Sequence, residues 1–439
     1  MSGIALLKAV SAGKPREIAL RILQRGADGD FLENRLAAAL AQSPLSPPDR
    51  HLCQELAYGI TRWQATLDWL IARKTAGRAQ KPKLQSLLRL GLYQIFWLDR
   101  IPNHAAVHET VELAKHEGFH TQAGFINALL RGYLREFDAT ARLLAELKTQ
   151  QPHLGYSHPE WLARRWHERW GADRAAQLME WNNQPPKTFA RVNTLKADPG
   201  KLLTQWRDEG VEYDFFRRDW LEENLVFELK SHPPLSRLPS FQQGQFYVQD
   251  PSTLLAVREL DPQSGENVLD LCAAPGGKLT AIAQFMHNEG RLVAHDTGPE
   301  RLELIHQNCA RLGVTCVETL IPSTLNAQPP AGFDRILVDA PCSNTGVMRR
   351  RIDLRWRIRP EELGRLRAIQ LELLRQAAPL LKPGGTLVYS TCSLEPEENS
   401  DVAREFLATH IEFKLERMRE LLPFVEGVDG TCVARMVRT

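Results

Sequence analysis

Residues 267–278 read NVLDLCAAPGGK, an apolar run that ends in an acid and then breaks into small residues and paired glycines. The run Val268–Leu271 has the continuous apolar character of a strand that is covered on both faces of a parallel sheet. Gly276 and Gly277 have no side chain, so backbone N–H groups can approach a ligand closely where the helix predicted over Leu279–Met286 begins. The stretch therefore predicts a strand, a tight turn and a helix that together hold a small polar ligand.

A second acid follows the next predicted strand. Asp296 comes just after the run Leu292–Ala294 and lies 19 residues beyond Gly277 (296 − 277). An acid at this place in a doubly wound sheet binds ribose hydroxyls, both in nicotinamide cofactors and in S-adenosylmethionine. The dinucleotide fingerprint GxGxxG is absent, which favours S-adenosylmethionine over the alternative of a nicotinamide oxidoreductase. Glycine pairs and strand-end acids also occur in ordinary turns, so the rest of the chain must support the assignment.

Strands and helices alternate from Asp261 to the C-terminus, as a doubly wound Rossmann-like sheet requires. The predicted strands are Val268–Leu271, Leu292–Ala294, Val314–Val317, Ile336–Val338, Leu387–Ser390 and Val433–Val437. The predicted helices are Leu279–Met286, Pro299–Arg311, Glu361–Leu381 and Pro396–Ala408. We therefore expect the third domain of the chain, residues 261–439, to be an α/β domain.

The first part of the chain is helical throughout. The clearest apolar stripe, in which Gly91 should let a neighbouring helix come close, consists of Leu84, Leu87, Leu88, Gly91, Leu92, Ile95 and Phe96. We predict an all-α domain of five or more helices over residues 1–140, a linker over 141–160 and a small α/β subdomain over 161–260. Tryptophans mixed with arginines after Pro159 fit RNA binding, but they fit a solvated helix face with a buried stripe better.

Composition excludes several classes of protein. The 439 residues include 55 basic and 53 acidic side chains, so a nucleic-acid partner must be met by local patches. The seven cysteines are odd in number and form no C-x-x-C pair, which argues against a disulfide framework and against a metal site. No apolar run approaches eighteen residues, and the apolar run near the N-terminus is too short for a signal peptide. We expect a cytoplasmic monomer with no membrane partner.

Two cysteines follow neighbouring predicted strands. Cys342 comes after Ile336–Val338, and Cys392 comes after Leu387–Ser390. If these strands are neighbours, their ends lie about 4.8 Å apart, so both thiols can face one pyrimidine ring. Carbon 5 of cytosine is a poor nucleophile, whereas a thiolate that adds to carbon 6 makes carbon 5 reactive. A second thiolate or a water can remove the carbon-5 proton, and Asp339 is placed to stabilise ring nitrogen 3.

The motifs of this region resemble those of the Sun-type RNA cytosine-5 methyltransferases. The resemblance rests on Asp270–Lys278, Asp339–Cys342, Thr391–Ser393 and Pro396–Asn399. It implies that Cys392 is the nucleophile and that Cys342 assists product release. It also implies that S-adenosylmethionine is bound by Cys272, Ala273, Ala274, Pro275, Gly276, Gly277, Lys278, Asp296 and Asp339.

The helical part is similar to the NusB antitermination domain, an RNA-binding bundle. The matching runs are Arg16–Leu20, Glu55–Gly59, Leu90–Gln94 and Phe125–Arg131. This domain narrows the resemblance to bacterial enzymes that modify small-subunit (16S) ribosomal RNA, which is then the expected partner. The alternative is a non-catalytic RNA-binding or antitermination factor, because after the third predicted strand, in Glu318–Ser323, no acid stands in register with the acid that relatives carry there. Further departures from the family pattern are Asn344, Arg351–Ile352 and Thr431–Cys432.

Arginines are concentrated just after Cys342. Eight arginines lie between Thr345 and Arg367, against three acids. Such a patch beside a proposed base site indicates a phosphate grip, which we assign to Arg349, Arg350, Arg351 and Arg355. The target base must leave its stack to reach two thiols, so we expect a looped or partly open RNA.

Overall fold

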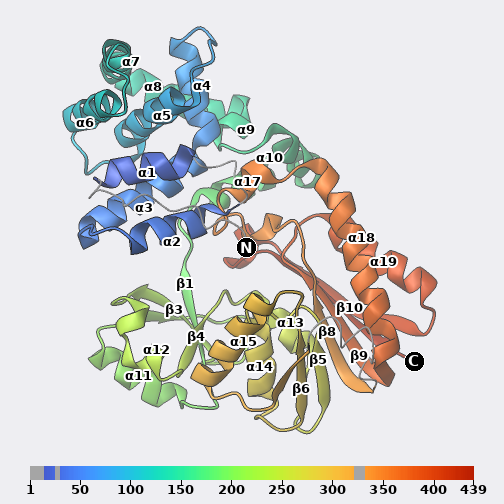
Figure 1. The fold of residues 1–439 in the computed structure, drawn as a ribbon. Coiled ribbons are helices and arrows are strands. Elements are labelled where there is room, and N and C mark those ends of the chain that lie inside the picture. The colour runs from blue at the N-terminus through green and yellow to red at the C-terminus, as the bar shows by residue number, and fades with distance from the viewer. Residues whose placement is uncertain (1–13, 25–29, 321–331) are drawn as a thin grey trace, which may run out of the picture. The chain divides into compact units, whose positions relative to one another are not determined.

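The computed structural model describes residues 14–24, 30–320 and 332–439. Contacts divide the chain into two units, which we call the helical unit and the sheet unit and describe separately (Figure 1). The helical unit comprises residues 1–184 and 348–357, and the sheet unit comprises residues 185–347 and 358–439. The chain thus enters the helical unit a second time, for ten residues that follow the Cys342 loop.

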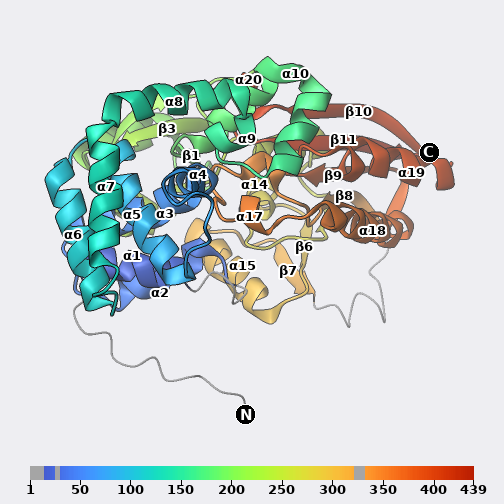
Figure 2. The same cartoon turned by 90° about the horizontal axis from the view of Figure 1, so that it is seen from above.

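Helices build the helical unit (Figure 2). The buried apolar residues of the helices between residues 15 and 135 meet in one core. The helices are α1 (Pro15–Gln24), α2 (Leu32–Ala41), α3 (Pro47–Arg62), α4 (Gln64–Lys74), α5 (Pro82–Trp97), α6 (Asn103–His116), α7 (Ala123–Arg135), α8 (Phe137–Gln150), α9 (Pro152–Gly155), α10 (Glu160–Asn183) and α17 (Leu354–Arg357). α5 contacts α1, α3, α4, α6 and α7. A Cβ atom on Gly91 would lie 2.7 Å from Leu130 Cδ1 and 3.2 Å from Thr110 Cγ2. The predicted all-α domain is confirmed, and Gly91 permits the predicted close approach of helices.

The region predicted as linker and small subdomain is divided between the two units. Residues 141–160 contain the end of α8 and all of α9, and α10 packs against α9 in the helical unit. The sheet unit begins with a small antiparallel sheet in the order β2-β3-β1-β4. Its elements are β1 (Thr188–Val192), α11 (Pro199–Asp208), β2 (Glu212–Phe215), β3 (Val226–Ser231), η1 (Leu235–Arg237), α12 (Pro239–Gln242) and β4 (Phe246–Val248).

The larger sheet has the order β10-β11-β9-β8-β5-β6-β7 within the described part of the sheet unit. Its strands are β5 (Asn267–Asp270), β6 (Arg291–His295), β7 (Val317–Leu320), β8 (Phe333–Asp339), β9 (Leu381–Thr391), β10 (Phe413–Leu421) and β11 (Thr431–Arg438). Strands β5 to β9 pair in parallel, whereas β11 runs antiparallel to both β9 and β10. The carboxyl ends of the parallel strands therefore meet at one edge of the sheet, where ligands bind in such folds.

Both faces of this sheet are covered (Figure 1). One face packs against α13 (Thr253–Leu260), α14 (Gly277–Phe285) and α15 (Pro299–Leu312), and the other against α18 (Pro360–Ala377) and α19 (Ser400–Thr409). Side chains alternate between the two layers, so that Val268 joins the first core and Leu269 the second. This double burial explains the continuous apolar strands and confirms the predicted Rossmann-like class.

Four elements differ from their prediction. The predicted helix Glu361–Leu381 divides into α18 and the 3₁₀ turn η3 (Ala378–Leu380), and Leu381 already belongs to β9. β7 begins at Val317, where the predicted third strand ends. β10 was not predicted because its FKLERMREL sequence is largely charged, as suits an edge strand that must not pair with another chain. The predicted helix Pro396–Ala408 divides into the 3₁₀ turn η4 (Pro396–Glu398) and α19, because Asn399 is non-helical, with φ −115° and ψ −96°.

The close packing at Gly91 gives a stability prediction. Gly91→Ala should lower the free energy of unfolding of the helical unit by about 1–3 kcal/mol, because the new methyl group overlaps Leu130 in a closed core. Urea denaturation followed by circular dichroism measures the change. Gly124→Ala on α7 is the control, because a Cβ atom there meets no atom within 4 Å and should be neutral or stabilising. Equal stability of the two variants would contradict the assigned role of Gly91.

Candidate active site

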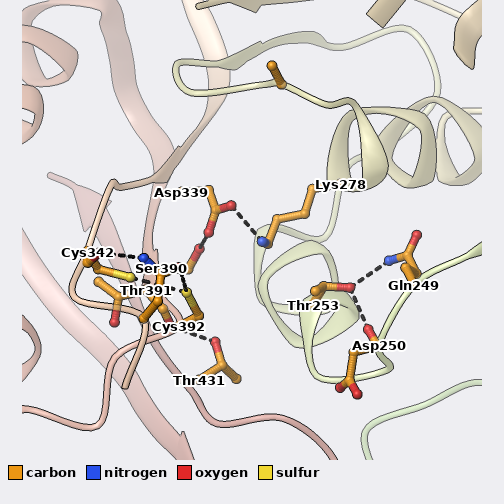
Figure 3. Close-up of polar contacts among 12 residues, drawn as sticks. Gln249, Asp250, Thr253, Lys278, Asp339, Cys342, Ser390, Thr391, Cys392 and Thr431 are labelled. Carbon is orange, nitrogen blue, oxygen red and sulfur yellow. Dashed lines mark hydrogen bonds and ion pairs between the residues drawn. The ribbon is translucent and has the colours of Figure 1, made fainter. Parts of the chain in front are cut away.

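The two predicted thiols meet at the carboxyl edge of the sheet. β8 and β9 are parallel neighbours with Asp339 opposite Ser390, so the loops that follow them start side by side. Cys342 Sγ lies 3.2 Å from Cys392 Sγ (Figure 3). The hydrogen bond with Cys392 and burial raise the pKa of Cys342 well above its ordinary value. Cys342 is therefore a neutral thiol in the free protein and shares a hydrogen bond with Cys392.

A buried carboxylate holds the two thiol loops together. Glu398 accepts hydrogen bonds from the backbone N–H of Ser343 at 2.8 Å and from Ser393 Oγ at 2.5 Å. Ser343 Oγ and Gln370 Nε2 also donate to it. Sequence reasoning quoted Glu398 within a motif but gave it no role. The sequence does contain a signal for a shared hydrogen-bond partner, because Ser343 directly follows Cys342 and Ser393 directly follows Cys392.

Asn344 contacts both thiol segments. Its Nδ2 donates to the carbonyl oxygen of Cys342 at 2.7 Å, and its Oδ1 lies 3.0 Å from Cys392 Sγ. The backbone φ of Asn344 is +58°, in the left-handed region that asparagine tolerates better than most residues. The sequence departs from the family pattern at this position, and as a result the side-chain amide of Asn344 contacts the sulfur of Cys392.

Lys278 brings positive charge to the thiols. Its Nζ lies 2.6 Å from Asp339 Oδ2, and Ser390 Oγ donates to Asp339 Oδ1 at 2.7 Å (Figure 3). Burial lowers the pKa of Lys278, but the charge and hydrogen bond of Asp339 and the charge of Cys392 outweigh burial, so the pKa is raised. Lys278 therefore remains an ammonium, and its charge interacts with Cys392.

The glycine turn lies between two acids. Gly276 has φ +101°, which suits glycine, and it caps the N-terminus of α14. Asp296 accepts from the backbone N–H of Ala274 at 3.0 Å and from Arg301 Nε at 2.6 Å. Arg301 is about half exposed, at 56%, and also donates to the carbonyl oxygen of Ala274 at 3.2 Å. The structure thus brings the predicted acid against the predicted turn.

Asp270, the last residue of β5, is a second acceptor at the turn. It is buried, and neither of its carboxylate oxygens accepts a hydrogen bond of normal geometry from the described residues. Burial raises the pKa of Asp270 to about 7, and the charge of Asp339 adds to the rise. Unpaired acceptors beside a glycine turn fit the amino group and the ribose hydroxyls of S-adenosylmethionine. The fold and these acceptors fit a methyltransferase that uses this cofactor.

Comparisons with known proteins identify the family. The 16S rRNA methyltransferase RsmB/F model matches residues 257–429, the NusB model residues 13–135, and the ferredoxin-like domain of RsmF/B-like methyltransferases residues 158–228. The probable ribosomal RNA small subunit methyltransferase B of Bacillus subtilis is 38% identical over 96% of this chain and 98% of its own length. The corresponding Klebsiella pneumoniae protein is 36% identical over 90% and 92%. The chain belongs to the ribosomal RNA small subunit methyltransferase B family.

Solved structures agree with this assignment. A methyltransferase homologue from Pyrococcus horikoshii is 31% identical, covers 65% of this chain and 97% of its own, and has a TM-score of 0.58. The protein PH0851 covers 98% of this chain and all of its own at 25% identity, with a TM-score of 0.78. The chain is an RNA methyltransferase of the Sun type, and its cofactor is S-adenosylmethionine, as predicted. Family membership removes the alternatives of an oxidoreductase and a non-catalytic factor.

The predicted phosphate grip is wrong for two of its four arginines. Arg355 is 0% exposed and donates to the carbonyl oxygens of Ser157 and Asn182 at 3.1 and 2.9 Å. Arg349 is 1% exposed, and its guanidinium lies 3.9 Å from the ring centre of Trp181. Both arginines fasten residues 348–357 inside the helical unit, because a buried guanidinium needs acceptors or an aromatic face.

The remaining two arginines are placed differently. Arg351 is exposed and Arg350 is partly exposed, so an RNA contact by these two stays a prediction.

The stretch in which the family acid is missing runs into residues 321–323, which lie outside the described part of the chain. The described residues contain no cluster of three or more acids, histidines and cysteines suited to a metal ion, and none of their helices is long and apolar enough to cross a membrane.

The raised pKa of Asp270 predicts a pH dependence of stability. Its folded pKa of about 7 exceeds its unfolded pKa, so the folded state binds the extra proton and loses this stabilisation as the pH rises toward 7. The stability of Asp270→Asn relative to the natural protein should rise by up to about 1.4 kcal/mol per pH unit between about pH 5 and 7. Urea denaturation without cofactor at several pH values measures this difference. The exposed Asp208→Asn is the control, and parallel curves for Asp270→Asn and the natural protein would disprove the prediction.

Proposed function

We propose that this chain methylates carbon 5 of a cytosine in 16S ribosomal RNA through a covalent adduct with Cys392. The observation that carries the proposal is the 3.2 Å approach of Cys342 Sγ to Cys392 Sγ at the carboxyl edge of the sheet. Two thiols at one point suit a reaction in which one sulfur bonds to carbon 6 and another group removes the proton from carbon 5. The names of the relatives support the choice of ribosomal RNA.

The reaction begins at Cys392. Its thiolate, stabilised by Lys278, attacks carbon 6 of the cytosine, and electron density moves toward carbon 5 and ring nitrogen 3. We assign Asp339 to the stabilisation of nitrogen 3, because Lys278 and Ser390 hold both of its carboxylate oxygens in place. S-adenosylmethionine supplies the electrophilic methyl group. The turn residues 272–278 and Asp296 are the groups that we assign to holding it.

The electrostatics of the thiol pair set the order of the later steps. The pKa of Cys342 is raised first by its hydrogen bond with Cys392 and then by burial and by the charge of Cys392. Once the sulfur of Cys392 is bonded to carbon 6, its charge is gone and it is a poorer hydrogen-bond partner. The pKa of Cys342 then falls, so Cys342 releases its proton to water and becomes competent as a base only after the adduct has formed. It takes the carbon-5 proton, the bond between sulfur and carbon 6 breaks, and Cys392 leaves as a thiolate.

RNA contacts complete the proposal. The helical unit contains the NusB-type domain, and we assign RNA binding to it and to Arg350 and Arg351. Because the target base must reach the thiols, the bound RNA is looped or partly open at the modified position. We further propose that the protein acts as a cytoplasmic monomer.

Substitution of each cysteine tests the mechanism. Cys392→Ala should abolish methyl transfer, because no sulfur is left to attack carbon 6. Cys342→Ala should slow product release and accumulate a protein–RNA adduct that survives denaturing gel electrophoresis. Cys316→Ser is the matched control, because Cys316 lies outside the thiol pair, and it should turn over normally without an adduct. Full turnover by Cys392→Ala would rule out the adduct.

Chemical mapping tests the substrate. One cytosine of 16S ribosomal RNA should resist bisulfite conversion in cells that contain the protein and should be converted in cells that lack it. Complementation with Cys392→Ala is the control, because that variant should leave the cytosine convertible. An unchanged bisulfite pattern in the deletion strain would contradict methylation of carbon 5, and a changed pattern in another RNA would contradict the choice of substrate.

A further inference from the structure

Arg191 on β1 is a buried cation that the proposed mechanism does not use. The residue is 1% exposed, and its Nη1 donates to Gln249 Oε1 and to the carbonyl oxygen of Gly277, both at 2.8 Å. Its Nη2 donates to Thr280 Oγ1 at 3.0 Å. No carboxylate of the described residues lies within ion-pairing distance of Arg191. The small sheet therefore places an uncompensated guanidinium against the first turn of α14.

Such an arrangement is costly. A buried charge without an opposite charge is strongly destabilising unless neutral groups satisfy its donors. Burial accordingly lowers the pKa of Arg191 to about 9. Three neutral acceptors offset this cost, and two of them, the carbonyl oxygen of Gly277 and Thr280 Oγ1, belong to the first turn of α14.

The small sheet packs against the glycine turn. Tyr247 on β4 covers Gly277, because a Cβ atom on Gly277 would lie 3.2 Å from Tyr247 Cε1. The guanidinium of Arg191 lies 5.4 Å from the ring centre of Tyr247. Gln249, one of the three acceptors of Arg191, donates to Thr253 Oγ1 at 2.6 Å and so connects the small sheet to α13 (Figure 3).

Peptide geometry shows how the small sheet controls the direction of a backbone donor at the glycine turn. The peptide group between Gly277 and Lys278 is planar and trans, so its C=O and N–H point in opposite directions. Glycine has no side chain to fix this plane, which is set here by the start of α14 and by the hydrogen bond from Arg191. By holding the carbonyl oxygen of Gly277, Arg191 fixes the direction of the Lys278 N–H, one of the backbone donors at the N-terminus of α14.

We propose that Arg191 is a positioning residue for S-adenosylmethionine, and that the small sheet sets cofactor affinity by fixing the glycine turn through it. The site requires the planar set of donors of a guanidinium and not charge alone. One guanidinium donates to three acceptors, of which two lie on α14 and one lies just after β4. A lysine keeps the charge but cannot reach all three acceptors in that geometry. The small sheet thus has a role in cofactor binding in addition to any contact with RNA.

Binding measurements on the full chain test this proposal. Equilibrium dialysis gives the Kd for S-adenosylmethionine, filter binding gives the Kd for a 16S ribosomal RNA fragment, and circular dichroism gives the Tm. Arg191→Lys and Arg191→Met should each weaken cofactor binding about tenfold to a hundredfold, while RNA affinity stays within about twofold. The control is Arg207→Met, on an exposed position of α11 in the same small sheet region, and it should change neither affinity.

The outcomes separate a positioning role from a structural one. Selective loss of cofactor affinity in Arg191→Lys supports the proposal, and that conservative variant carries the test if Arg191→Met does not fold. Wild-type cofactor affinity in either folded variant would overturn it. Parallel losses of cofactor affinity, RNA affinity and Tm would also overturn it, because they would show that Arg191 only stabilises the fold. None of these results depends on which base is methylated.

Discussion

The hydrogen bonds of Glu398 to both thiol loops are the constraint on which the site depends. Parallel pairing of β8 with β9 brings the strand ends together but leaves the loops beyond them free to diverge. Glu398 closes that gap, because one carboxylate accepts donors from Ser343 and Ser393 and is buried with them. A carboxylate in such a place is stable only while its donors remain, so the two cysteine loops are held as one piece.

Three cations make separate stabilising contacts in the molecule. Lys278 connects the cofactor turn to Asp339 and brings a positive charge close to Cys392. Arg191 holds the turn from the small sheet, and Arg355 fastens the ten residues 348–357 within the helical unit. Those ten residues follow the Cys342 loop directly in the chain. The chain that leaves the Cys342 loop therefore enters the helical unit, which contains the NusB-type domain.

Sequence reasoning predicted the elements whose signal is local. The apolar runs of β5, β6 and β8, the stripe of α5 and the glycine turn are patterns that physics imposes on neighbouring residues, and each lies where it was predicted. Prediction failed where tertiary context decides. β10 is charged because it lies at a sheet edge, and the arginines after Cys342 resemble a surface patch although Arg349 and Arg355 are buried. Arginine has no pattern that distinguishes a phosphate contact from an internal clamp.

The sequence by itself determined the class of fold, the cofactor turn and the presence of two strand-end thiols, because each follows from the periodicity or spacing of residues along one segment. Only the tertiary structure decided that the sulfurs lie 3.2 Å apart, that Glu398 joins their loops, and that Arg191 reaches Gly277 across 86 positions of sequence. These contacts join segments that share no local pattern. They exist because strand order and helix packing bring distant side chains to the same edge of one sheet.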